Sequence, residues 1–428
     1  MIGALYSTAW WLALPLVLAR LWWRGRREAG YRQHIAERLG IYGRELKPRD
    51  GQAVIWIHAV SVGETRTAEP LIDALLQTYP EHSIVLTHMT PTGRTTGQAL
   101  FATYAPRVVQ CYLPYDIASM ASRFLDHFKP RLCVLMETEV WPNTVAQCVR
   151  HQVPVALVNA RLSDRSLKKG QRMSALMGQA AKSLECVAAQ TVADAERLTK
   201  LGARNVQVTG SIKFDVAPPA NAGIDGAELR RLFGMRSILL CASTRDGEEA
   251  LILDSMAQVD LGDALLIIVP RHPQRFNDVS RMIDARGLQM ARRSTLDGTP
   301  LAANVQVLLG DSMGEMFAYY AACDVAFIGG SLLPLGGQNM IEACALGKPV
   351  LFGPHTFNFN LISEDAVEAG AAVRVPDATT MLREALHLLH SESERNARGA
   401  KALAFAEQHR GAAQRTMNLL QPFLMHQQ

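Results

Sequence analysis

The stretch AVIWIHAVSVGETRTAEPLIDALLQT, residues 53–78, joins an apolar run, a polar turn and a second, amphipathic run. Residues 53–59 have the length and the apolar composition of a buried strand. Residues 67–78 place their apolar side chains at helical spacing, so we expect a helix there. A buried strand followed directly by a helix is the repeating unit of a parallel α/β sheet.

The same alternation continues on both sides of one break. Before the break we expect strands at residues 84–87, 132–136, 155–159, 186–189 and 206–208, with a helix at residues 117–127 among them. After the break we expect strands at residues 238–242, 265–269, 305–308, 325–328, 350–352 and 372–375. The pattern predicts an α/β protein with two Rossmann-like domains. Because ligands bind beyond the carboxyl ends of such strands, we expect the two domains to face a cleft.

The break itself predicts the domain boundaries. Its sequence, VAPPANAGIDG at residues 216–226, is rich in Pro, Gly and Ala and is typical of a linker. We therefore predict an N-terminal segment at residues 1–27, a first domain at residues 28–215 and a second domain at residues 227–428. The helices at the end of the second domain are expected to be able to pack back on the first. A chain of 428 residues is long enough for this division.

The N-terminus predicts a membrane anchor. Residues 1–19 carry no charged side chain, and Arg20, Arg24, Arg26 and Arg27 follow them. A helix of this length covers about 28 Å, close to the thickness of a hydrocarbon core. A cleaved signal peptide has its basic residues before the apolar run, so we predict a membrane-spanning anchor with the rest of the chain on the cytoplasmic side. A helix lying on the membrane, or a buried core helix, is the alternative.

Charge and cysteine content exclude two classes of protein. The net charge is +4, but the first 50 residues hold nine Arg or Lys against four Asp or Glu, so the remaining 378 residues are close to neutral. A nucleic-acid binder needs a basic face on its folded body, and we expect no nucleic-acid partner. The seven cysteines are scattered without the spacing of metal ligands, which favours reduced core thiols over a zinc site.

Polar side chains follow the predicted strands of the first domain. Glu64, in SVGET, is either a partner of the helix dipole or a general base at the carboxyl edge of the sheet. Glu137 and Glu139, in METEVWPN, follow another strand, and an extended stretch would place both carboxylates on one face. Lys213, in GSIKFD, is either a surface lysine or a cation that offsets negative charge in a transition state.

The second domain carries a denser set of polar motifs. VPRHPQRF, residues 269–276, groups Arg271, His272 and Arg275 into a cationic cluster suited to a phosphate. In residues 329–354 a Gly-rich loop leads into a helix with Glu342 in its first turn. A helix N-terminus binds phosphate, and a carboxylate accepts hydrogen bonds from ribose hydroxyls. This combination predicts a nucleotide sugar as ligand. The sequence lacks the GxGxxG pattern of dinucleotide binding, and it lacks the GxxxxGK[ST] phosphate loop, which argues against ATP-driven work.

Taken together, these motifs resemble a known family. SVGE, TPTG, LPYD, METEVWPN, NARLS, GSIKFD, VPRHPQRF, GDSMGE, GGQNMIEA and GPHTFNF stand in the order found in 3-deoxy-D-manno-octulosonic acid (Kdo) transferases. With YRQHIAERLG at residues 31–40, the resemblance runs from the N-terminal segment to about residue 360. It implies a GT-B fold and an inverting transfer, with no metal and no cofactor, from CMP-Kdo to the lipid A precursor (lipid IVA). It also implies lipopolysaccharide core biosynthesis at the inner membrane surface of a Gram-negative bacterium, with the catalytic body on the cytoplasmic face.

The resemblance also implies roles for individual residues. Glu64 looks like the catalytic base, and Glu137 and Lys213 look like stabilisers of the transition state. The implied CMP-binding surface consists of Pro270, Arg271, Met313, Gly314, Glu315, Asn339, Met340, Ile341 and Glu342. One departure is Gln338, which stands where the resemblance leads us to expect a histidine. An amide there still donates and accepts hydrogen bonds, so CMP binding is expected to survive.

Two further functions are considered from the sequence. One is another GT-B enzyme that uses a different nucleotide sugar or works as an epimerase. The other is a membrane scaffold without catalytic activity. The density of polar motifs at the carboxyl ends of the predicted strands argues against a scaffold.

Overall fold

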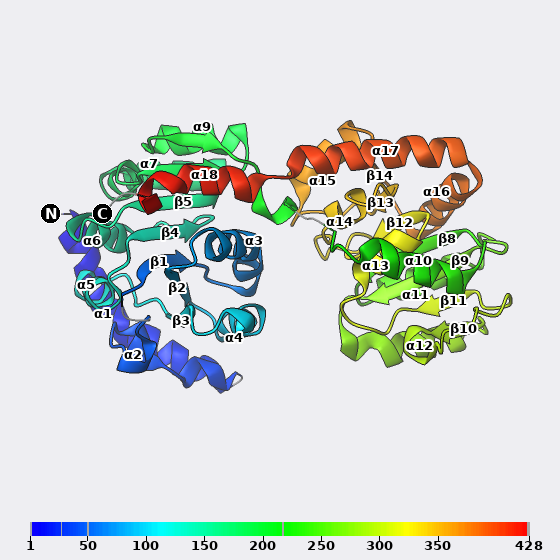
Figure 1. The fold of residues 1–428 in the computed structure, drawn as a ribbon, viewed down its shortest axis with the longest axis horizontal. Helices are drawn as coiled ribbons and strands as arrows, with labels where there is room; N and C mark the ends of the chain where they lie inside the picture. Colours follow the sequence, from blue (N-terminus) through cyan, green and yellow to red (C-terminus); the bar gives the residue numbers. More distant parts are fainter. Residues whose placement is uncertain (1, 27, 49–50, 216–217, 426–428) are drawn as a thin grey trace. The chain divides into compact units, whose positions relative to one another are not determined.

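A computed structural model describes residues 2–26, 28–48, 51–215 and 218–425, and the chain divides into two compact units (Figure 1). The first unit comprises Met1–Asp215 with Gly411–Gln428, and the second comprises Val216–Arg410. Each unit is built around its own seven-stranded sheet. Residues 1 and 27 of the predicted N-terminal segment and residues 216 and 217 of the predicted linker lie outside the described residues.

The sheet of the first unit is parallel, with the strand order β3-β2-β1-β4-β5-β6-β7. The strands are β1 (Ala53–His58), β2 (His82–His88), β3 (Val108–Tyr112), β4 (Leu132–Met136), β5 (Val155–Ala160), β6 (Cys186–Ala189) and β7 (Val206–Val208). The helices are α1 (Ile2–Arg24), α2 (Ile35–Arg38), α3 (Val62–Thr78), α4 (Pro91–Leu100), α5 (Ala118–Phe128), α6 (Pro142–Arg150), α7 (Asp164–Arg172), α8 (Gln179–Lys182), α9 (Val192–Leu201) and α18 (Ala412–Met425). The order reverses between β1 and β4, the place where doubly wound sheets bind ligands.

Strand β1 shows why this sheet is buried on both faces. Successive side chains of a strand point to opposite faces. Ile55 and Ile57 pack in one core cluster with side chains of α3 and α18, whereas Val54 and Trp56 pack in a second cluster with side chains of α5 and α6. A strand covered on both faces needs a continuous apolar run rather than an alternating one, and residues 53–57 have one.

The sheet of the second unit is also parallel, in the order β10-β11-β9-β8-β12-β13-β14. The strands are β8 (Ile238–Thr244), β9 (Leu265–Pro270), β10 (Met290–Arg292), β11 (Val307–Leu309), β12 (Val325–Ile328), β13 (Val350–Phe352) and β14 (Ala372–Arg374). The helices are α10 (Ala222–Phe233), α11 (Glu248–Ser255), α12 (Phe276–Asp284), α13 (Met316–Ala322), α14 (Ile341–Cys344), α15 (Asn360–Glu368), α16 (Ala378–His390) and α17 (Glu392–His409). Here the order reverses between β8 and β12.

The last helix, α18, belongs to the first unit although it follows the second unit in the chain (Figure 1). Its buried side chains Met417 and Leu420 share a core cluster with Leu71 and Leu75 of α3. The carboxylate of Asp215 accepts hydrogen bonds from the backbone N–H groups of Gly411 (2.8 Å) and Ala413 (2.7 Å). The residue that ends the first segment of this unit therefore caps the helix that begins its second segment.

Helix α1 corrects the prediction of a membrane-spanning anchor. Within the described ranges, no helix combines the length and apolar character that crossing a membrane requires. The predicted span is wrong because the apolar side chains of α1 are divided between two environments. Leu14 packs in a core cluster with Tyr115, Ile117 and Met120 of the first unit. The opposite face of α1 exposes the large apolar side chains of Leu5, Leu12, Leu16 and Trp23, and Trp11 and Trp22 are exposed between the two faces.

The strand–helix alternation expected from the sequence is confirmed, with differences at the sheet edges. Strands β3 and β10 were not predicted, and both are edge strands with partly exposed side chains, so they lack the apolar run that marks a buried strand. Helix α3 begins at Val62 rather than at residue 67, because its first turn is polar and is stabilised through the Glu64 carboxylate.

Asp215 provides a test of how α18 is attached. We expect Asp215→Ala to lower the free energy of unfolding by about 1–2 kcal/mol, because two backbone donors at the start of α18 lose their acceptor. Urea denaturation measures this difference. The matched control is Asp284→Ala, at an exposed carboxylate on α12. Equal stability of the two variants would show that the cap does not hold α18.

Candidate active site

Glu64 lies in the first turn of α3, directly after β1 at the carboxyl edge of the first sheet. Its Oε2 accepts a hydrogen bond from the backbone N–H of Val60 at 2.7 Å, and its Oε1 accepts a longer one from Ser61 Oγ at 3.4 Å. Burial raises the pKa of Glu64 to about 7, and the charges of Glu139 and Glu137 add to the rise, whereas the Val60 N–H opposes it. A carboxylate with a pKa near neutrality suits a general base.

Glu137 stands next to Glu64 in the sheet order, at the carboxyl end of β4. It is only 4% exposed, and two cations from other segments bind it. Lys213 Nζ lies 2.6 Å from Oε1, and Arg161 Nε lies 3.0 Å from Oε2. The structure thus brings the predicted residues Glu137 and Lys213 into direct contact. Arg161, a residue of the NARLS motif for which no role was predicted, completes the cluster.

Asn159, at the end of β5, holds the segment that carries Lys213. Its Oδ1 accepts hydrogen bonds from the backbone N–H of Ile212 at 3.0 Å and from Ser211 Oγ at 3.3 Å. Asn159 and Glu137 both have left-handed backbone angles, with φ of 51° and 54°. Such angles are costly for residues other than glycine, and they concentrate at functional sites. The NARLS motif therefore supplies two residues of this region, Asn159 and Arg161, and only their contacts with Ile212, Ser211 and Glu137 show what they do.

The prediction that an extended stretch places the Glu137 and Glu139 carboxylates on one face is wrong. Residues 137 and 138 form a turn rather than an extended stretch, and Glu137 is left-handed, so strand alternation does not set the directions of the two carboxylates. Glu139 instead accepts a hydrogen bond from Trp141 Nε1 at 2.8 Å. Burial raises the pKa of Glu139, and the charge of Glu137 adds to the rise.

Two buried histidines, His58 and His88, are the last residues of the neighbouring strands β1 and β2. His58 Nδ1 lies 2.9 Å from Thr87 Oγ1, and His88 Nδ1 lies 3.1 Å from the carbonyl oxygen of Ala59. Burial, together with the charge of His88, lowers the pKa of His58 to about 3. Burial likewise lowers the pKa of His88 to about 4. Both rings are therefore neutral near pH 7 and act as fixed hydrogen-bonding groups.

In the second unit, Glu248 organises the switch point between β8 and β12. The side chain is fully buried, and its two oxygens accept hydrogen bonds from the backbone N–H groups of Gly330 (2.5 Å), Ser331 (2.9 Å) and Leu332 (2.9 Å). Gly329 permits this approach, because a Cβ there would lie 2.6 Å from Thr244 Cα. In the sequence, Glu248 stands in STRDGEE (residues 243–249), and a helix-start motif of this kind carries no signal for a contact with a distant loop.

The predicted CMP-binding residues lie along the carboxyl edge of the second sheet. Pro270 ends β9, and the backbone N–H of Arg271 donates to the carbonyl oxygen of Thr244 at 2.9 Å. Asn339 Nδ2 donates to Glu342 Oε1 at 3.4 Å. Burial raises the pKa of Glu342, while the Asn339 hydrogen bond and the positive charge of Arg271 oppose the rise. Arg271, Asn339 and Glu342 are thus electrostatically linked.

Other members of the predicted set differ in what they can offer a ligand. The side chains of Met340 and Ile341 are buried in the core, and the backbone N–H of Ile341 donates to Asn339 Oδ1 at 3.1 Å. Met313 is 65% exposed. Arg275 does not join Arg271 in a free cationic cluster, as the sequence suggested, because it pairs with Asp246 at 2.8 Å and with Glu249 at 3.3 Å.

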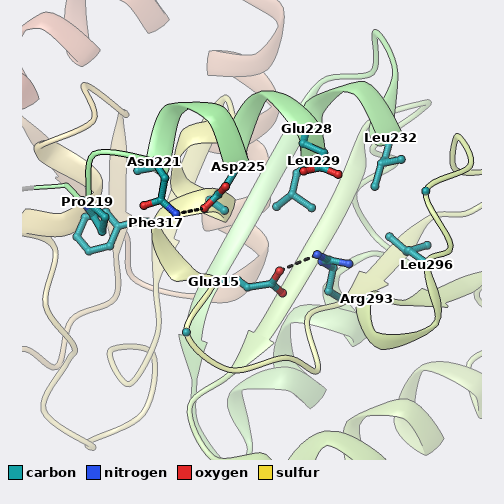
Figure 2. A pocket seen from close by; sticks show the side chains of 14 residues that line it. Pro219, Asn221, Asp225, Glu228, Leu229, Leu232, Arg293, Leu296, Glu315 and Phe317 are labelled. Carbon is teal, nitrogen blue, oxygen red and sulfur yellow. Dashed lines mark hydrogen bonds and ion pairs between the residues drawn. The ribbon is translucent and has the colours of Figure 1, made fainter. Parts of the chain in front are cut away.

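A pocket of about 370 Å³ lies in the second unit between α10, the loop before α13 and residues 293–298 (Figure 2). Figure 2 shows Glu315 and Arg293 pointing toward each other, and Arg293 Nη2 lies 2.6 Å from Glu315 Oε1. Gly314 and Glu315 line this pocket, whereas Arg271, Asn339 and Glu342 do not. The pocket therefore adjoins one end of the predicted CMP surface and does not contain all of it.

In the part of the chain that the structure describes, no three His, Cys, Asp or Glu side chains are grouped so that they could hold a metal ion. All seven cysteines are buried and unpaired.

Comparison with known proteins gives related sequences over nearly the whole chain. The family model described as 3-deoxy-D-manno-octulosonic-acid transferase (kdotransferase) matches residues 33–216. A 3-deoxy-D-manno-octulosonic acid transferase of Bordetella pertussis is 44% identical, over 96% of each chain. A protein of the same name from Haemophilus influenzae is 37% identical, over 98% of each chain.

Two solved structures are similar in fold. A glycosyltransferase from Rickettsia africae aligns with a TM-score of 0.57 at 11% identity, covering 88% of this chain and 100% of the other. The UDP-GlcNAc 2-epimerase from Neisseria meningitidis aligns with a TM-score of 0.57 at 14% identity, covering 87% and 100%. At these identities the likeness shows the fold alone, which is GT-B-like, with two Rossmann-like sheets.

The buried histidines predict how stability changes with pH. In the unfolded chain a histidine has a pKa of 6.5, so as pH falls below 6.5 the unfolded state takes up protons that folded His58 and His88 do not. Their contribution to stability is complete above pH 6.5 and is lost on acidification. Glu64 acts in the opposite sense, because its raised pKa lets the folded state bind a proton between pH 7 and pH 4.5.

Comparison of variants separates the histidine contribution from that of Glu64. We expect His88→Gln to remove about 1–2 kcal/mol of the loss in unfolding free energy that the parent protein shows between pH 7 and pH 5. Urea denaturation at the two pH values measures it. His390→Gln, at an exposed position of α16, is the control and should retain the parent slope. A parent-like slope for His88→Gln would contradict the assignment.

Proposed function

We propose residue roles for this chain, which belongs to the family of 3-deoxy-D-manno-octulosonic acid (Kdo) transferases and is therefore a glycosyltransferase that transfers Kdo. In our proposal the donor is CMP-Kdo and the acceptor is the lipid A precursor of lipopolysaccharide core biosynthesis. One observation about the site is the main support for this proposal. A carboxylate with a pKa of about 7, Glu64, stands beside a buried carboxylate that Lys213 and Arg161 bind.

Glu64 is the proposed general base. It removes the proton from an acceptor hydroxyl, and the oxygen then attacks the anomeric carbon of Kdo as the bond from that carbon to the CMP phosphate breaks. The chain's Val60 N–H holds the carboxylate in one orientation. A single base on the acceptor side is what an inverting displacement requires.

Lys213 and Glu137 are the proposed stabilisers of the transition state. Glu137 fixes Lys213 and Arg161 in position, so their positive charge is already organised when negative charge develops. On the donor side, Arg271 supplies a cation, and Glu342 with Asn339 supplies acceptors and donors for a ribose. The predicted residues Pro270, Met313, Gly314, Glu315, Met340 and Ile341 complete the proposed CMP surface through backbone and side-chain contacts.

The other candidate functions receive less support. The likeness to a UDP-GlcNAc 2-epimerase is at 14% identity and supports a shared fold only. A scaffold without catalysis gives no reason for a buried carboxylate at a left-handed position with two bound cations, because this arrangement costs stability.

Substitution of Glu64 tests the proposed base. We expect Glu64→Gln to lower the rate of Kdo transfer by about 100-fold to 10,000-fold, since an amide accepts no proton. CMP binding, measured by calorimetry, should be unchanged because the proposed donor residues belong to the other unit. Glu69→Gln on the same helix is the control and should keep full activity. Normal turnover by Glu64→Gln would refute this role.

For the parent enzyme, the transfer rate should fall as pH drops below about 7, where Glu64 becomes protonated.

The exposed apolar face of α1 supports a location at the inner membrane surface. We propose that α1 lies in the membrane interface at the cytoplasmic face, with Leu5, Leu12 and Leu16 toward the lipid. The unpaired cysteines are consistent with a reducing compartment. The basic side chains near the end of α1 would face anionic headgroups.

A paired substitution tests this location. Leu12→Glu/Leu16→Glu should weaken sedimentation with anionic phospholipid vesicles by roughly 10-fold, because two apolar contacts with lipid are replaced by charges. Ile224→Glu/Met235→Glu alters two apolar residues of the second unit whose exposure is similar or greater, and this variant should bind vesicles as the parent does. Loss of binding in both variants, or in neither, would contradict a specific role for α1.

A further inference from the structure

Helix α7 carries four exposed cations on one face. Arg165, Lys168, Lys169 and Arg172 occupy positions i, i+3, i+4 and i+7, which lie together on a helix. We call these four residues the α7 basic ridge. The opposite side of α7 is buried through Leu167 and Gly170, and a Cβ at Gly170 would lie 2.8 Å from Leu201 Cδ1 of α9. Packing against α9 therefore fixes which face of α7 is open.

The α7 basic ridge has no partner within the part of the chain that the structure describes. No ion pair or hydrogen bond of its four side chains is found there. The one acid of the helix, Asp164, lies 3.6 Å from Arg197 of α9 instead. Like charges at i, i+3 and i, i+4 destabilise a helix, so this arrangement is unfavourable for folding alone. A multiply charged anion bound to the ridge would relieve this repulsion.

The ridge begins beside the proposed catalytic cluster. Arg161, in the loop between β5 and α7, binds Glu137 at 3.0 Å, and Glu137 binds Lys213. Ser163 Oγ accepts from the backbone N–H of Ser166 at 3.2 Å and so caps the start of α7 next to that loop. The catalytic cluster and the ridge are thus consecutive in the chain and joined by one capped turn.

The ridge ends toward the proposed membrane-facing helix. Directly after α7 the chain forms a short π-helix, Ser174–Gly178, which packs against α1. Met173, between the two, is 43% exposed. The basic surface therefore extends from the proposed acceptor end of the reaction toward the helix with the exposed apolar face. An amphiphile with a charged headgroup fits this order of surfaces.

We propose that the α7 basic ridge binds the phosphate groups on the saccharide headgroup of the lipid acceptor. This inference rests on the proposed function, because it requires a phosphorylated glycolipid as acceptor. Lys and Arg side chains form strong charge-assisted hydrogen bonds with phosphate oxygens. The ridge is a positioning surface for the acceptor and takes no part in bond formation.

The test uses the full-length enzyme in detergent micelles, so that adsorption to a membrane does not contribute. The variant is R165Q/K168Q/K169Q/R172Q, in which glutamine keeps the helix propensity and removes the charge. With the phosphorylated lipid A precursor, KM for the acceptor should rise roughly 10-fold to 100-fold, since four exposed charge contacts are lost. KM for CMP-Kdo should be unchanged. With the same glycolipid after enzymatic removal of its phosphates, parent and variant should have equal acceptor KM values.

The matched control removes the same number of charges elsewhere. K129Q/R204Q/R383Q/K401Q alters four exposed basic residues that lie off α7, and its acceptor KM should equal that of the parent. If the fourfold ridge variant loses its circular dichroism signal, the double variant K168Q/K169Q replaces it, with an expected rise of several-fold. An unchanged acceptor KM in a folded ridge variant overturns the inference. An equal rise with the dephosphorylated acceptor also overturns it. Failure of the parent enzyme to transfer Kdo to either acceptor would instead overturn the proposed function.

Discussion

The buried carboxylate of Glu137 is the constraint on which the active region of the first unit depends. A charge removed from water is tolerated only if partners compensate it. Lys213 and Arg161 supply that compensation from two different segments, and Asn159 holds the backbone next to Lys213. The end of β4, the start of the α7 loop and the segment after β7 are therefore drawn together by one negative charge. Removing it would leave two cations without their partner.

In the second unit, backbone N–H groups rather than side-chain cations compensate a buried carboxylate. Glu248 is as deeply buried as Glu137, but its oxygens accept hydrogen bonds from N–H groups of the loop after β12. This contact joins the start of α11, which follows β8, to the loop after β12 at the switch point of that sheet. One unit thus presents organised positive charge at its carboxyl edge, and the other presents a Gly-rich loop held by hydrogen bonds to Glu248. In the proposed roles, the first arrangement belongs to the base-and-acceptor region and the second to the nucleotide-binding region.

Several features could be predicted from sequence because they are local. The strands of both sheets were visible as apolar runs, except for β3 and β10, whose edge positions leave side chains partly exposed. Glu64, Glu137 and Lys213 were singled out by the motifs around them and by their resemblance to a family. The predicted cationic role of Arg275 failed, because Asp246 and Glu249 neutralise it and neither pairing is visible in the sequence.

The sequence by itself determined the strand–helix alternation, the two sheets and the family. Each of these depends on short apolar runs or on ordered motifs, which can be recognised without knowing which distant residues they contact. Only the tertiary structure decided that α18 completes the first unit and that α1 divides its apolar residues between the core and the surface. It also decided that Glu64 has a pKa near 7 and that Glu137 binds Lys213 and Arg161. The physical reason is that burial and ion pairing are properties of side chains that meet in space, and residues 64, 137, 161 and 213 are brought together only when four different strands align at one edge of a sheet.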